Sequence, residues 1–106
     1  MAESRAHQMA KFRSAGFGGQ VEVRLPSGRR LDALSRNGVW GTEVETSRSF
    51  SRLQLAVERL LESRARQRVL KVPQADMRLA AVVLRRMGVT AWVRNMDGSE
   101  EFFVGK

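Results

Sequence analysis

Three carboxylates in the first half of the chain are spaced so that folding could bring them together. Asp32 lies in the run GRRLDAL, and Glu43 and Glu45 follow in WGTEVE. Side chains two residues apart in a strand share a face, so Glu43 and Glu45 would point the same way. If Asp32 ends the neighbouring strand, the three carboxylates converge. Hard oxygen ligands suit Mg²⁺ or Mn²⁺, and the pattern therefore predicts a divalent-cation site.

The elements that would position these carboxylates are three short strands joined by two turns. Apolar and polar residues alternate over 20–25, as in a half-buried strand. The Pro-Ser-Gly sequence at 26–28 is typical of a turn, and residues 30–34 continue as a second strand. Asn-Gly at 37–38 predicts another turn, which leads into a third strand over 39–45.

The remaining helices and strands are expected from the periodicity of apolar residues and from residues that end such elements. The first helix has Ala6, Met9, Ala10 and Arg13 recurring at helical spacing, and Ser51 with Gln54 resembles a capping box at the start of the second. The expected ranges are a helix over 2–14, a helix from 51 to about 67, a strand over 68–72, a helix from 74–76 to 87, and strands over 89–94 and 101–104. Strands that alternate with helices imply parallel pairs beside an antiparallel meander, so we expect an α/β fold with a mixed sheet. At 106 residues, the chain is expected to form a single domain over 1–106.

The net charge of the chain indicates what kind of partner it binds. Lys and Arg number 19 against 11 Asp and Glu, a net charge of +8, and this excess favours a polyanion. We expect DNA as this partner, with RNA as the alternative.

The chain has no cysteine, which excludes disulfides and cysteine-rich zinc sites. No long apolar run or secretory signal is present, so the expected location is cytoplasmic and not membrane-bound, with a secreted toxin domain as the alternative.

The order of elements, with Asp32 and then Glu43-x-Glu45 on adjacent strands, resembles the PD-(D/E)XK nuclease superfamily. Small members of it include Holliday-junction resolvases, restriction enzymes and nuclease domains of interbacterial toxins. The resemblance covers about residues 3–94 and rests on a motif of three residues. It implies a restriction-endonuclease-like αβββαβ core, followed here by a further helix and a hairpin.

The resemblance also implies roles for the site residues. Asp32 and Glu43 would bind Mg²⁺ or Mn²⁺, with the Val44 carbonyl as an additional ligand. Glu45 takes the position of the family's catalytic lysine, where a carboxylate could serve as base or bind a second ion. Glu22 on the first strand could add a further ligand.

Other candidate residues lie around this motif. A guanidinium matches a phosphate in a bidentate way, so five arginines are candidates for nucleic-acid binding: Arg24, Arg29, Arg30, Arg48 and Arg52. Arg48 or Arg52 could also supply the missing positive charge, although arginine is too basic to act as the base. Gln54 matches a polar position of some relatives. His7, the sole histidine, is expected at the surface rather than in the site.

These residues predict a metal-dependent endonuclease that hydrolyses DNA phosphodiester bonds. One alternative is an RNA-directed nuclease. Another is a non-catalytic nucleic-acid-binding or protein-interaction module, which the glutamate in place of lysine permits. The purely structural interpretation is that Asp32 flanks a turn and that both glutamates form the polar face of an ordinary strand. A homodimer through Phe102, Phe103 and Val104 is the alternative to their packing in the core.

Overall fold

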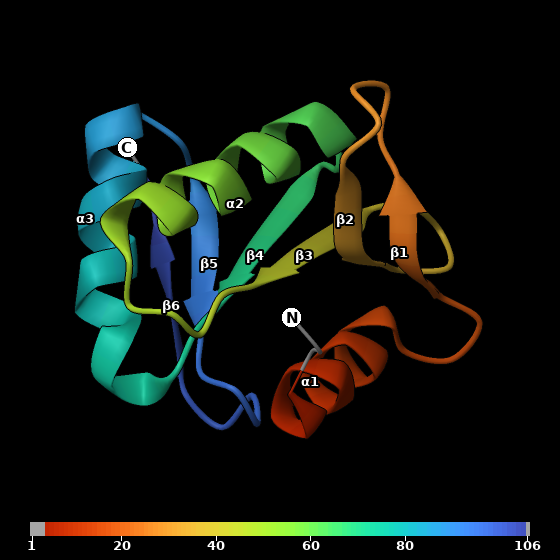
Figure 1. Ribbon diagram of the computed structural model, residues 1–106, viewed down its shortest axis with the longest axis horizontal. Helices are drawn as coiled ribbons and strands as arrows, with labels where there is room; N and C mark the ends of the chain where they lie inside the picture. The colour runs from red at the N-terminus through yellow and green to blue at the C-terminus, as the bar shows by residue number, and fades with distance from the viewer. Residues whose placement is uncertain (1–3, 106) are drawn as a thin grey trace.

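The chain folds around one six-stranded sheet whose strand order follows the sequence, β1 to β6 (Figure 1). The computed structural model describes residues 4–105. The elements in chain order are α1 (Arg5–Ala15), β1 (Gln20–Arg24), β2 (Arg30–Leu34), β3 (Trp40–Val44), α2 (Phe50–Ser63), β4 (Gln67–Lys71), the 3₁₀ turn η1 (Gln74–Asp76), α3 (Met77–Met87), β5 (Ala91–Arg94) and β6 (Glu101–Val104).

The sheet is mixed, as predicted. Strands β1, β2 and β3 form an antiparallel meander, β3, β4 and β5 run parallel, and β6 returns antiparallel to β5. The predicted order of helices and strands is confirmed, and the ranges expected for β2 and β6 coincide with those observed.

Helices cover both faces of the sheet. The helices α2 and α3 pack side by side on one face, and α1 lies on the other, against β1, β2 and β3 (Figure 1). Right-handed crossovers explain this arrangement, because β3–α2–β4 and β4–α3–β5 step in the same direction along the sheet. The main core lies beneath α2 and α3 and includes Leu31, Val57, Leu70, Leu84 and Val93.

Helix α2 begins at Phe50, and its N-cap lies two residues before the expected one at Ser51. Ser49 is the N-cap, with an extended backbone and with its Oγ accepting from the Arg52 N–H at 3.3 Å. Ser51 already lies inside the helix, so the prediction of a box formed by Ser51 and Gln54 was wrong. Gly88 ends α3 in the left-handed conformation.

Of the residues that indicated helix α1 by their spacing, only Ala10 is buried. The helix buries Ala10, Lys11 and Ala15, while Met9 and Phe12 are 51% and 65% exposed. The sheet beneath α1 carries charged side chains, and polar groups on the helix pair with them.

Within the described part of the chain, no helix is long and apolar enough to span a membrane.

Candidate functional site

Two carboxylates lie between β2 and β3 and bond to the backbones of both strands. Strand pairing runs through Ala33 with Thr42 and through Leu34 with Gly41. One step further on, the Asp32 N–H donates to Glu43 Oε2 at 2.8 Å, and the Val44 N–H donates to Asp32 Oδ2 at 2.7 Å. The side chains thus accept hydrogen bonds at the point where the next backbone ladder bonds would be expected, and the predicted proximity of Asp32 and Glu43 is observed.

The two acids approach this point from opposite faces of the sheet. Leu31 and Ala33 are fully buried, and Leu31 packs in the core under α2, so Asp32 between them projects toward α1. Its Oδ2 lies 3.6 Å from His7 Nε2. Glu43 points to the other face, where Arg59 of α2 donates to its Oε1 at 3.0 Å.

Burial makes it difficult for both acids to be ionised. Glu43 is 1% exposed, and its burial, followed by the charge of Asp32, raises its pKa to about 8 despite the opposing guanidinium of Arg59. Burial also raises the pKa of Asp32, while the Val44 N–H and the charges of His7 and Lys11 act in the other direction. Two adjacent carboxyls of this kind hold a proton at neutral pH unless a cation takes its place.

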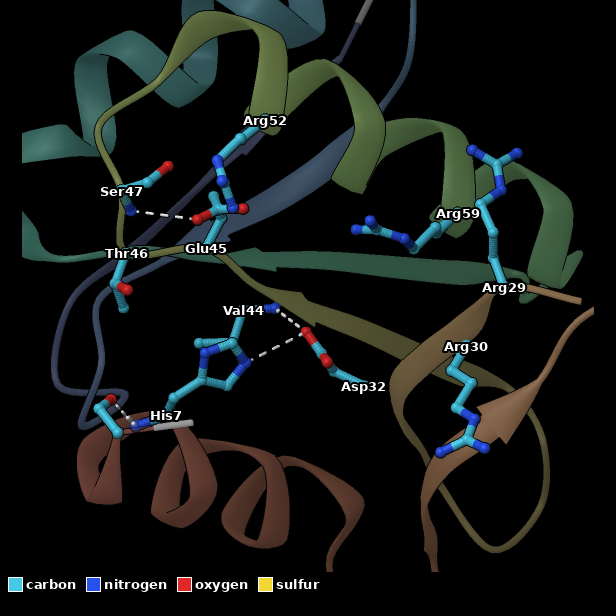
Figure 2. A pocket seen from close by; sticks show the side chains of 11 residues that line it. His7, Arg29, Arg30, Asp32, Val44, Glu45, Thr46, Ser47, Arg52 and Arg59 are labelled. Carbon is cyan, nitrogen blue, oxygen red and sulfur yellow. Dashed lines mark hydrogen bonds and ion pairs between the residues drawn. The ribbon is translucent and has the colours of Figure 1, made fainter. Parts of the chain in front are cut away.

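A cleft of about 710 Å³ opens beside Asp32. Figure 2 shows basic side chains from β2 and α2 around this opening, with Asp32 and His7 facing each other at its centre. Three of the predicted arginines line it, and Arg59 joins them. The lining residues are Ser4, His7, Arg29, Arg30, Asp32, Val44, Glu45, Thr46, Ser47, Arg52 and Arg59.

Glu45 lies on the wall of the cleft but does not join the other two acids. Its Oε2 accepts from the Ser47 N–H at 3.1 Å, just past the end of β3 (Figure 2). Among residues 4–105, no three Asp, Glu or His side chains are grouped so as to hold a metal ion. The expected convergence of three carboxylates is therefore a pair, because the chain turns away after Val44 and takes Glu45 with it.

The other candidates are spread around this pair. Glu22 lies across from Asp32 on β1, has a left-handed backbone (φ 54°) and forms an ion pair with Lys11. Arg48 is bound elsewhere, with its Nε 2.5 Å from Asp76 Oδ1. Arg24 and Gln54 are not among the residues that line the cleft.

Three residues near the acids were not expected there: His7, Lys11 and Arg59. His7 is half-buried beside Asp32 rather than on the surface, and Lys11 is only 4% exposed. A signal for both existed, because His7, Lys11 and Ser14 recur at helical spacing and form a polar stripe on α1. Arg59 follows Arg52 by two helical turns, which places both arginines on the same side of α2.

Asp32 and Glu43 are the two carboxylates of the site that could hold a hard divalent cation. Mg²⁺ is commonly held by one or two carboxylates and completes its shell with water and phosphate oxygens, so a pair suffices. Asp32, which is half-buried, and Val44 line the cleft, while Glu43 lies buried behind them.

Neither a protein-family model, a curated protein nor a solved structure matches this chain.

Proposed function

We propose that the chain is a metal-dependent endonuclease that hydrolyses the phosphodiester bonds of DNA. One observation carries this proposal: the half-buried Asp32 and the buried Glu43 meet between β2 and β3, beside a cleft lined with arginines. The order of helix, three-stranded meander, helix and strand supports a restriction-endonuclease-like core, because each acid then occupies the strand that the PD-(D/E)XK resemblance implies.

Each part of the site has a role in this proposal. Asp32 and Glu43 hold the ion, with the Val44 carbonyl as an additional ligand. An ion held there would polarise a phosphoryl oxygen and lower the pKa of a water that attacks phosphorus. Arg30 and Arg52 bind the phosphates that flank the reacting one. Glu45, on the cleft wall, accepts the proton of the water.

Helix α1 supplies positive charge that β3 lacks. Lys11 is buried and pairs with Glu22, and its charge acts to lower the pKa of Asp32. It therefore favours the ionised form of Asp32, which is the form that binds a cation. A lysine on the first helix thus offsets in part the glutamate found at the motif's lysine position.

A non-catalytic nucleic-acid-binding module is the second candidate. The ion pair between Arg59 and Glu43 favours it, because a guanidinium already neutralises the acid that would hold the ion. The separation of Glu45 from the acid pair points the same way. In this alternative the arginines bind phosphates and the buried acids serve only to hold β2, β3 and α2 together.

Cleavage of supercoiled plasmid with Mg²⁺ or Mn²⁺ tests the proposal. The wild type is expected to nick or linearise the DNA only with a divalent ion, and Asp32→Asn and Glu43→Gln are each expected to lose at least about 100-fold in rate. Glu58→Gln, on the exposed side of α2, is the matched control and should cleave normally. Metal-independent cleavage, or variants as fast as the wild type, would contradict the proposal. A folded protein that binds DNA without cutting it would support the binding module, and a structured RNA in a parallel assay tests the RNA alternative.

A further inference from the structure

Arg59 contacts Glu43 of the acid pair and also lines the open cleft. Its NH1 lies 3.0 Å from Glu43 Oε1, and the Glu43 side chain is 2% exposed while that of Arg59 is 29% exposed. The same arginine lines the cleft with Arg30 and Arg52 (Figure 2). The guanidinium of Arg59 therefore bonds to a carboxylate shielded from water and also borders a surface suited to phosphate.

The guanidinium occupies a position that a cation would need. Glu43 Oε2 already accepts from the Asp32 N–H, and Arg59 holds Oε1. A divalent ion bound to Glu43 Oε1 would displace the guanidinium N–H of Arg59 and would also be repelled by the positive charge of that residue. The ion and the ion pair compete for the same oxygen.

A phosphate in the cleft offers Arg59 another partner. Guanidinium groups bind phosphate oxygens through two parallel hydrogen bonds, and these charge-assisted bonds are among the stronger ones in proteins. Once Arg59 turns to a phosphate, Glu43 loses the positive charge that compensates its burial. A buried carboxylate left unpaired is costly, so the affinity of Glu43 for a divalent ion rises.

We propose that Arg59 couples phosphate binding in the cleft to cation binding at Glu43, exchanging its carboxylate partner for a nucleic-acid phosphate. This inference rests on the proposed function, because it takes Glu43 as a metal ligand. Arg59 acts as a positioning residue, since it works through Glu43. Coupling of this kind is reciprocal: the ion must strengthen nucleic-acid binding by the same factor by which nucleic acid strengthens ion binding.

Mn²⁺ binding with and without a short DNA duplex tests the coupling. Free Mn²⁺ is measured by electron paramagnetic resonance near neutral pH, and the Asp32→Asn variant reports the Mn²⁺ that associates with DNA alone. In the wild type, the duplex is expected to tighten Mn²⁺ binding by about tenfold. Arg59→Met is expected to bind Mn²⁺ about tenfold more tightly without DNA and to gain less than about twofold from the duplex. Duplex integrity is checked on a gel after each titration.

Two further variants keep the result interpretable. Arg52→Met removes another cleft arginine and should keep the coupling, while Arg59→Lys keeps the charge and should keep the weak Mn²⁺ affinity of the DNA-free protein. Protonation of Glu43 does not reverse the expected sign, because a divalent ion feels about twice the repulsion from Arg59 that a proton feels.

Equal or weaker Mn²⁺ binding in a folded Arg59→Met protein would overturn the inference, as would coupling that persists in this variant. These outcomes are distinguishable from failure of the proposed function. A protein that cleaves plasmid but shows no coupling retains the nuclease and loses the role of Arg59. Coupling without cleavage retains the role of Arg59 at a metal-binding site that does not turn over. Absence of Mn²⁺ binding in every variant overturns both.

Discussion

Glu43 is an acid that the fold buries between the backbone of Asp32 and the guanidinium of Arg59, and its ionisation opposes folding. Its pKa rises from 4.5 to about 8, mainly because of burial. The folded chain therefore keeps the proton over a pH range in which the unfolded chain has lost it. The contribution of this group to stability is complete below its unfolded pKa and is lost as pH rises toward its folded pKa.

The wild type should accordingly become less stable between about pH 6 and pH 8, by on the order of 2–3 kcal/mol, in urea denaturation without divalent ions. Glu43→Gln should lose most of this slope because the carboxyl at position 43 is gone. Lys71, with a pKa lowered by burial from 10.5 to about 8, is charged in both states below pH 8 and adds little slope there. Glu58→Gln is the exposed control and should keep the wild-type slope. A slope in Glu43→Gln equal to that of the wild type would refute the assignment.

Among the elements, α1 differs from α2 and α3 in what holds it to the sheet. Lys71, 2% exposed on β4, donates from Nζ to Ser14 Oγ at 2.7 Å, and Ser14 in turn donates to the Ala10 carbonyl. Lys11 pairs with Glu22 on β1. Helix α1 is thus fixed over the site largely by buried polar contacts, whereas α2 and α3 enclose the apolar core.

Ser14→Ala is expected to cost about 1–3 kcal/mol in urea denaturation, because it leaves the buried ammonium of Lys71 without this acceptor. The loss should be local: hydrogen exchange is expected to speed up in α1 more than in α2 or α3. Ser47→Ala, at an exposed position, is the control and should change stability by less than about 0.5 kcal/mol. Uniform acceleration of exchange across all three helices would show that Ser14 acts on the whole fold instead.

The sequence predicted the elements better than their contacts, for a physical reason. Period-2 alternation and the turn residues near Gly28 and Gly38 depend on local conformational preferences, so the three strands of the meander were found. The acid pair followed, since strand pairing determines which residues meet. Contacts such as Glu43 with Arg59, or Asp32 with His7, depend on how helices dock on the sheet, and helical spacing alone does not give this. The burial of Lys11 in α1 depends on docking in the same way.

At the scale of the whole molecule, the chain carries an excess of positive charge, and a basic cleft lies beside β2 and β3. Arg30, Arg52 and Arg59 line it, and Arg29 does so while pairing with Glu62 at 3.0 Å. An arginine that already has an acidic partner gains less from a phosphate, since it must share its charge. The contribution of each arginine to binding should therefore depend on its partner as well as on its position.

The salt dependence of DNA binding should therefore change when a cleft arginine is removed and not when an arginine elsewhere is removed. With divalent ions removed by chelation, the logarithm of the affinity measured by fluorescence anisotropy should fall linearly with that of salt between roughly 50 and 200 mM. Arg52→Ala is expected to reduce this slope by about 1, as expected for one lost phosphate contact. Arg29→Ala should reduce it by less, because Glu62 already screens that charge. Arg78→Ala, exposed on α3 and outside the cleft, should leave it unchanged. If Arg78→Ala lowers the slope as much as Arg52→Ala, phosphate contacts are distributed over the surface and the cleft is not the binding site.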